Sequence, residues 1–385
     1  TPKPKFVSIN RKTFLYYSLR NPTNSDIFLL LKFLRNSLQS FSFSMEWVRG
    51  ETIGYGTFST VNLVTPLNIK NSGDFPTLLA VKSADSYGAA AITNEKSVLD
   101  SLGDCPEIVR CFGEDHTVEN GEKLHNLLLE YASRGSLATQ LKKLNGEGLP
   151  ESEVRRHTGS VLRGLRHIHS NGFAHCDIKL GNILLFGDGA VKIADFGLAR
   201  KVDEELTASN EGVKIRGTPL YMAPESVNEN EYGAAADVWA LGCAVVEMFS
   251  GKTAWSVKEG SNFVSLLMRI GVGEELPKIP EELSEEGKDF VSKCFVKDPE
   301  KRWTAEMLLN HSFVAVDQRE DFVVKVKDEV ATSPRCPFEF YDWESVSPDS
   351  PTQSHPLDSP VERFESLVSE SIPDWSLAEG WVSVR

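Results

Sequence analysis

Apolar residues recur without a break from Glu46 to about Phe313, and the change in their spacing along this stretch is the strongest constraint on the fold. At first the pattern comes in short strand-like pieces, at 47–53, 59–64 and 77–82. Farther on it comes in long helix-like pieces. We therefore expect one α+β domain at 46–315, in which a small strand-rich lobe (46–132) precedes a larger helical lobe (133–315).

The two ends of the chain differ in composition from this central stretch. Residues 1–45 are basic and rich in serine, with a single acid, Asp26. An organellar transit peptide has this balance, but we expect instead a poorly ordered extension, or upstream sequence outside the natural product. Residues 316–385 are acidic and rich in Ser and Pro, so we expect a flexible tail there.

Charge and composition exclude several classes of function. The formal net charge of −14 argues against a nucleic-acid binder, which needs a basic face for the phosphate backbone. The six cysteines are scattered, which fits neither a zinc site nor a disulfide scaffold and indicates a reducing compartment. No apolar run reaches the length of about 18 residues typical of a membrane-spanning helix. We expect a soluble cytoplasmic protein and leave nuclear entry open.

A glycine-containing stretch, Gly54-Tyr55-Gly56-Thr57-Phe58-Ser59-Thr60-Val61, lies between two strand-like pieces. Its glycines allow the backbone to come close to phosphate oxygens, which backbone N–H groups can bind. Ser59 stands where a third glycine is usual, and an ordinary hairpin turn explains the pattern about as well. A dinucleotide-binding loop requires a helix directly afterwards, so the strand-like residues that follow favour a hairpin.

Lys82 ends a strand-like piece, and Glu95 follows in a helix-like one. Glu95 lies at helical spacing from the apolar residues at 92, 99 and 102, which puts its carboxylate on the buried face. A buried carboxylate needs a partner, and Lys82 is the natural candidate. Taken singly, a surface lysine and a solvated glutamate explain the two residues equally well.

The decisive pattern is the run His175-Cys176-Asp177-Ile178-Lys179-Leu180-Gly181-Asn182-Ile183-Leu184, followed by Asp195-Phe196-Gly197. It offers two carboxylates and an amide on loops between short apolar strands. One carboxylate can accept the proton of an attacking hydroxyl, while the other and the amide can hold magnesium against phosphates. Lys179 adds a positive charge near the group that is transferred.

These residues, in this order and at these spacings, resemble the signature set of the protein kinase family over about 270 residues. The resemblance implies the bilobal kinase fold, with a β-rich N-lobe that carries one key helix and a mostly α-helical C-lobe. It implies ATP and Mg²⁺ as cofactors, Asp177 and Lys179 as catalytic residues, and Asn182 and Asp195 as metal ligands. Residues implied to bind ATP are Ile53, Gly54, Gly56, Val61, Ala80, Lys82, Glu95, Glu130, Ala132 and Leu184.

The same resemblance extends to the substrate class. Lys179 and Thr218 resemble the serine/threonine branch, and the stretch Gly217-Thr218-Pro219-Leu220-Tyr221-Met222-Ala223-Pro224-Glu225 resembles MAP kinase kinase kinases of the MEKK type. The tail stretch Ser333-Pro334-Arg335-Cys336-Pro337-Phe338 resembles the short plant members of that group. It also implies that Glu225 pairs with Arg302 and that Asp237 anchors the catalytic loop. MAP kinase kinases are the implied protein substrates, and MAP kinase feedback on the four Ser-Pro pairs of the tail is a hypothesis beside a merely unfolded tail.

Cys176 departs from the arginine common at this position of the family. That arginine normally meets a phosphate on the activation segment, where Thr207, Ser209 and Thr218 are the candidate residues. We therefore hypothesise that activity depends less on such phosphorylation. The alternatives to a MAP kinase kinase kinase are a serine/threonine kinase of another branch and a pseudokinase scaffold, although every residue required for catalysis is present.

Overall fold

The computed structural model describes residues 5–9, 12–16, 46–56, 58–67, 76–202, 216–256 and 263–315. The chain divides into two units, Thr1–Met45 and Glu46–Arg385. In the first unit, β1 (Lys5–Ile9) and β2 (Lys12–Tyr16) pair as an antiparallel hairpin, which is regular structure inside the stretch where the composition predicts a poorly ordered extension. Thr207, Ser209 and the Ser-Pro pairs of the tail lie outside the described residues.

The second unit opens with an antiparallel sheet of five strands in the order β3-β4-β5-β7-β6. Its strands are β3 (Trp47–Gly56), β4 (Ser59–Pro66), β5 (Leu79–Ala84), β6 (Cys111–Glu119) and β7 (Glu122–Glu130). Strands β3 and β4 pair Gly54 with Val61 and Gly56 with Ser59, so the glycine stretch forms a hairpin and no helix follows it. The dinucleotide-binding alternative is thereby excluded.

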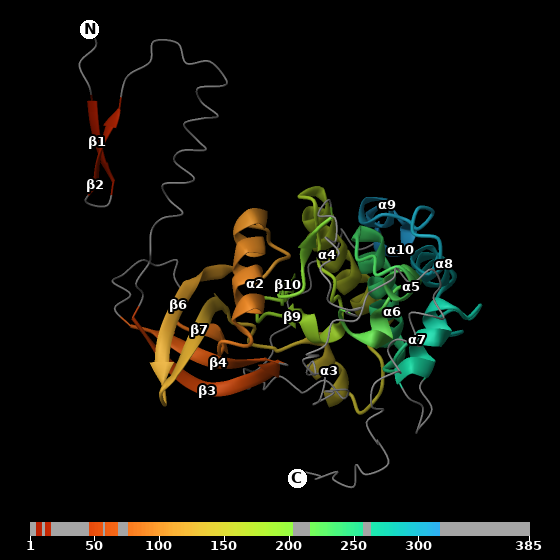
Figure 1. The fold of residues 1–385 in the computed structure, drawn as a ribbon. Helices are drawn as coiled ribbons and strands as arrows, with labels where there is room; N and C mark the ends of the chain where they lie inside the picture. The colour runs from red at the N-terminus through yellow and green to blue at the C-terminus, as the bar shows by residue number, and fades with distance from the viewer. Residues whose placement is uncertain are drawn as a thin grey trace, which may run out of the picture. The chain divides into compact units, whose positions relative to one another are not determined.

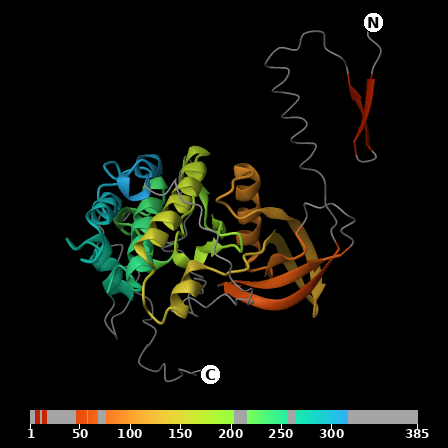
Figure 2. The same ribbon diagram turned by 180° about the vertical axis from the view of Figure 1, so that it is seen from behind.

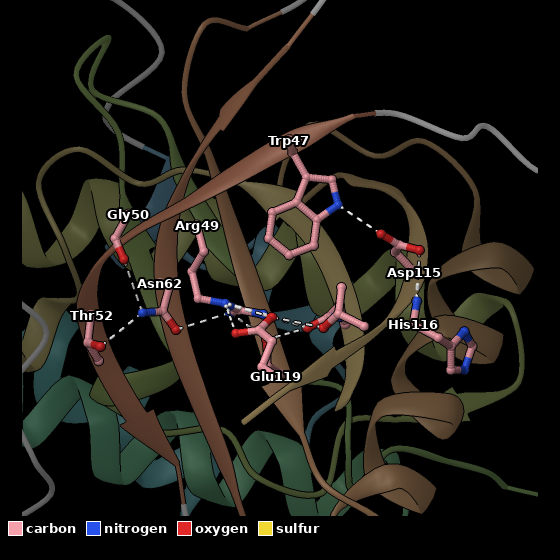
Figure 3. A network of polar contacts seen from close by, with 11 residues as sticks. Trp47, Arg49, Gly50, Thr52, Asn62, Asp115, His116 and Glu119 are labelled. Carbon is pink, nitrogen blue, oxygen red and sulfur yellow. Dashed lines mark hydrogen bonds and ion pairs between the residues drawn. The ribbon is translucent and has the colours of Figure 1, made fainter. Parts of the chain in front are cut away.

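The two edge strands of this sheet, β3 and β6, approach each other across one of its faces (Figure 3). Arg49 of β3 donates to Glu119 of β6 at 2.8 Å, and Trp47 donates to Asp115 at 3.0 Å. Beneath Arg49, the buried residues Ser83 and Asn126 accept from its guanidinium at 2.9 and 3.0 Å. This polar network closes the sheet and ties down the strand that leads into the glycine hairpin.

The opposite face of the sheet packs against a single helix, α2 (Ala89–Leu102), as Figure 1 shows. Ile92, Glu95, Leu99 and Leu102 are all buried on this helix. Glu95 therefore lies on the inward stripe, where its helical spacing predicts it.

The described residues of the second unit that follow the sheet are mostly helical, and their helices gather to one side of the sheet (Figures 1 and 2). Helix α6 (Ala234–Ser250) is apolar on every side and buried almost throughout, which is typical of a central core helix. Around it lie α3 (Leu137–Lys143), α4 (Glu151–Ser170), α5 (Pro224–Asn228), α7 (Phe263–Gly271), α8 (Glu285–Cys294), α9 (Ala305–Leu309) and α10 (Ser312–Ala315).

Short strands and turns between α4 and α5 carry the polar motifs. They are β8 (Phe173–Ala174), η1 (Leu180–Asn182), β9 (Ile183–Leu185), β10 (Val191–Ile193), β11 (Arg200–Lys201) and η2 (Pro219–Tyr221). Strands β9 and β10 pair with each other, and β11 pairs with β8. The sheet and the helices are thus segregated along the chain, which confirms the expected α+β fold of two lobes.

Candidate active site

Lys82 is one of the points at which the two lobes meet. Its side chain is 12% exposed, and its ammonium group donates to Glu95 Oε2 and to Asp195 Oδ1, both at 2.6 Å. Glu95 is fully buried on α2, while the Asp195 side chain is 44% exposed. The contact with Glu95 is the one that the sequence predicts, and the contact with Asp195 joins the sheet to the Asp195-Phe196-Gly197 turn.

Lys82 and Asp195 stabilise each other's charge, whereas burial raises the pKa of Glu95. Burial alone would lower the pKa of Lys82, but the Asp195 and Glu95 carboxylates outweigh it and hold that pKa well above its usual range. Burial would likewise raise the pKa of Asp195, but the Lys82 ammonium holds it well below its usual range. At neutral pH this site therefore presents an ammonium group and an ionised, partly accessible carboxylate.

Asp177 is held from several directions. Thr218 Oγ1 donates to Asp177 Oδ1 at 2.8 Å, and the Asn182 amide donates to Oδ2 at 3.0 Å. Lys179 Nζ lies 2.9 Å from Asp177 Oδ2 and also donates to Thr218 Oγ1 at 2.9 Å. The carboxylate is 8% exposed, so these contacts fix its orientation. A carboxylate of this kind can orient a hydroxyl group and accept its proton.

The loop that carries Asp177 is anchored from below by α6. Asp237 accepts the backbone N–H of His175 at 2.8 Å and that of Cys176 at 2.9 Å, and His169 lies 2.9 Å from the same carboxylate. Cys176 has a φ of 66°, a left-handed conformation that non-glycine residues rarely adopt. The buried aspartate anchors this loop, as the resemblance to the kinase family implies, and its two contacts hold the left-handed conformation of Cys176 in place.

Asn182 and Asp195 come together through the backbone. The N–H of Ala194 donates to the Asn182 carbonyl at 2.9 Å, so Asp195 follows directly after a contact with Asn182. Because the amide nitrogen of Asn182 is committed to Asp177, its amide oxygen is turned the other way. An amide oxygen and a carboxylate are suitable ligands for a hard divalent cation.

The remaining predicted ATP-binding residues line the same end of the sheet. Ile53 and Gly54 are buried in β3, Ala80 is buried in β5, and Val61 is paired with Lys82 across β4 and β5. The Glu130 side chain is held by Lys192 at 2.7 Å, and its backbone N–H donates to the Arg110 carbonyl at 2.9 Å. Ala132 follows where β7 gives way to the helical lobe, and Leu184 lies in β9 against the core.

Glu225 and Arg302 form a buried ion pair at 2.6 Å, with side chains 5% and 0% exposed. Glu225 lies on α5, shortly after Thr218, so the pair fastens the end of this segment to the helical lobe. It is the pair that the sequence predicts.

Asn94 is a site residue that the sequence analysis did not identify. Its amide nitrogen lies 2.9 to 3.3 Å from the backbone carbonyls of Phe196, Gly197 and Ala199. A polar residue next to Glu95 on a helix is the only signal in the sequence, and it does not distinguish this contact from exposure to solvent.

A family model described as the protein kinase domain matches residues 47–314. The match spans both lobes and every group described above, from the glycine hairpin to Arg302. The chain therefore belongs to the protein kinase family.

Named relatives narrow this assignment. The chain is 76% identical over 347 residues to mitogen-activated protein kinase kinase kinase 20 of Arabidopsis thaliana, covering 89% of this chain and 100% of that protein. It is 39% identical over 308 residues to mitogen-activated protein kinase kinase kinase 18 of the same plant, covering 78% and 86%. It is 37% identical over 292 residues to the serine/threonine-protein kinase BCK1/SLK1/SSP31 of Saccharomyces cerevisiae, covering 72% of this chain and 18% of that protein. Within the family, the chain is a serine/threonine kinase of the MAP kinase kinase kinase group.

None of the helices in the described ranges has the length and apolar character needed to cross a bilayer.

Proposed function

We propose that this kinase transfers the γ-phosphate of ATP to serine or threonine hydroxyls of MAP kinase kinases. The observation that carries the proposal is the contact of Lys82 with both Glu95 and Asp195, beside an Asp177 that is held by Asn182, Lys179 and Thr218. The names of the relatives support the choice of protein substrate.

Lys82 is the group that we assign to the α- and β-phosphates of ATP. Its ammonium is already aligned by two carboxylates, so little reorganisation is needed when the phosphates arrive. The backbone of the glycine hairpin at Gly54 and Gly56 covers the phosphates, and the backbones of Glu130 and Ala132 meet the adenine.

Asn182 and Asp195 are the residues that would hold Mg²⁺. Within the described ranges, no cluster of three or more His, Cys, Asp or Glu is arranged to hold a metal. Two protein ligands nevertheless suit this ion, which keeps waters and substrate phosphates in its remaining positions. When bound, Mg²⁺ supplies positive charge that neutralises the phosphate oxygens.

Asp177 is the residue that we assign to the incoming hydroxyl. Its carboxylate orients the serine or threonine of the substrate and accepts the hydroxyl proton as the new oxygen–phosphorus bond forms. Lys179, 2.9 Å from Asp177, lies where it can neutralise charge on the transferring phosphoryl group. Thr218 couples the substrate-side segment to this carboxylate through its hydroxyl.

The test is phosphorylation of a catalytically inactive MAP kinase kinase by the full chain, with Mg²⁺ and labelled ATP. Asp177→Asn and Lys82→Met are run in parallel, since each removes one charged group from the site. We expect label on serine or threonine of the substrate with the unmodified chain and its loss in both variants. Labelling of a generic acceptor such as myelin basic protein alone would contradict the substrate assignment, and ATP binding without any labelling would favour the pseudokinase scaffold.

A further inference from the structure

Asn94 lies on α2, directly before Glu95, and its contacts are not part of the chemistry assigned above. Its amide nitrogen donates toward the carbonyls of Ala199 at 2.9 Å, Gly197 at 3.0 Å and Phe196 at 3.3 Å. An amide NH₂ group has two N–H bonds, so the three carbonyls share them. We propose that Asn94 is a positioning residue that fastens α2 to the Asp195-Phe196-Gly197 turn, and so holds Lys82, Glu95 and Asp195 in line. This inference rests on the proposed function for its effect on catalysis.

Asn94 and Glu95 hold the same turn by groups of opposite polarity. Glu95 Oε1 accepts the backbone N–H of Phe196 at 3.1 Å, while its Oε2 accepts from Lys82 at 2.6 Å. Asn94 donates to the carbonyls of Phe196 and Gly197, which belong to the peptide groups that follow this N–H along the chain. Because an acceptor meets the N–H and a donor meets the carbonyls, one placement of the turn against the helix satisfies both residues.

The turn also packs closely against the helix. A Cβ atom added at Gly197 would lie 3.4 Å from the Cβ of Ala91, one helical turn before Glu95. Phe196 is fully buried, and its ring meets that of His175 edge to face with 4.8 Å between the centroids. Any outward movement of α2 must therefore break the Asn94 contacts together with the bonds from Glu95 to Phe196 and to Lys82.

The contacts of Asn94 favour an aligned state, in which α2 lies against the Asp195-Phe196-Gly197 turn, over a separated state, in which α2 has moved away from that turn. Loss of the two amide donors should make the separated state about 10-fold more populated, since each hydrogen bond contributes modestly but the carbonyls have no other donor from α2. If the aligned state is the major one, a 10-fold rise in the separated state changes the population of the aligned state only slightly, so rate measurements alone understate the shift. Backbone amide exchange of the Phe196 N–H measures it directly, because that N–H exchanges only after it leaves Glu95.

The experiment compares Asn94→Asp with Thr93→Asp in the full chain. Asn94→Asp keeps the shape of the side chain but turns the donors into anionic oxygens that face three carbonyls. Thr93→Asp adds the same charge at the preceding, exposed position, where the native side chain bonds only to the carbonyl of Ala89 on its own helix. Hydrogen exchange is followed over residues 194–200 and, as an internal reference, over α6.

We expect Asn94→Asp to speed exchange over 194–200 by about 10-fold while α6 is unchanged, and to lower kcat/KM for ATP. Thr93→Asp should leave both unchanged. Equal exchange over 194–200 in the two variants would overturn the inference, and so would equal acceleration over α6, which would show a general loss of stability. If exchange shifts as expected but the unmodified chain transfers no phosphate, the proposed function fails and the role of Asn94 in holding α2 stands.

Discussion

Arg302→Met tests how much the buried pair with Glu225 contributes to the stability of the helical lobe. The guanidinium makes five hydrogen bonds, two to the Glu225 carboxylate and three to the carbonyls of Val296, Ala235 and Lys297. Methionine fills much of the same volume but donates none of them. The substitution therefore leaves a buried carboxylate without its counter-charge and three carbonyls without donors.

We expect Arg302→Met to lower the free energy of unfolding by about 5 kcal/mol. This is the upper end of the range for breaking a buried ion pair, because the carbonyls lose their donors as well. Glu225→Gln should cost less, about 2 to 3 kcal/mol, because Arg302 keeps its three carbonyls and finds an amide oxygen in place of the carboxylate. In thermal unfolding, the loss in Arg302→Met should lower the midpoint by about 10 °C or more.

Urea and thermal unfolding of the full chain measure these differences, with Arg166→Met as the control. Arg166 lies 3.4 Å from Glu306 with side chains 50% and 60% exposed, and a surface pair of this kind should contribute less than about 1 kcal/mol. The reasoning from the carbonyl contacts is refuted if Arg302→Met lowers the free energy of unfolding by no more than Arg166→Met does. It is also refuted if Glu225→Gln lowers it by as much as Arg302→Met does.

Two further predictions concern groups buried elsewhere in the helical lobe. Burial lowers the pKa of His157 from 6.5 to about 3, so the unfolded chain binds a proton that the folded chain excludes, and stability falls as the pH drops below about 6.5. Between pH 7 and 5 the free energy of unfolding should decrease by about 2 kcal/mol more in the native chain than in His157→Leu, and parallel pH profiles of the two in urea would contradict this. The Cys176 thiol donates to the Ala174 carbonyl at 3.5 Å and offers no charge to a phosphate, so phosphatase treatment should lower kcat/KM by less than about 2-fold. Abolished activity after that treatment would show that the missing arginine is replaced by another phosphate-binding group.

Some site residues could be predicted from the sequence, either from the spacing of nearby apolar residues or from the order of the family's motifs. The burial of Glu95 followed from the helical spacing of its apolar neighbours, and burial in turn required Lys82 as its partner. The anchoring role of Asp237 came instead from the resemblance to the kinase family, and the apolar residues that follow it agree with its burial. For Glu95, a charge that cannot stay unpaired in the core points to its partner.

Contacts that depend on how distant segments close on each other could not be placed in this way. Arg49 and Glu119 lie on opposite edges of the sheet, and only the curvature of the whole sheet brings them within 2.8 Å. Strand periodicity fixes the face on which each side chain lies but not the distance between two edges. The left-handed conformation of Cys176 was equally invisible, because the sequence offers a cysteine where glycine or asparagine would be the usual signal.

Cys176 and Asn94 bear on the same physical question, which is how the segment after Asp195 is held in place. An arginine in the catalytic loop can hold that segment only when a phosphate is present, so the contact is conditional on modification. Asn94 holds the carbonyls of the segment itself, as far as Ala199, and needs no phosphate to do so. A kinase that lacks the contact between arginine and phosphate but has the Asn94 contacts should keep its site aligned without phosphorylation.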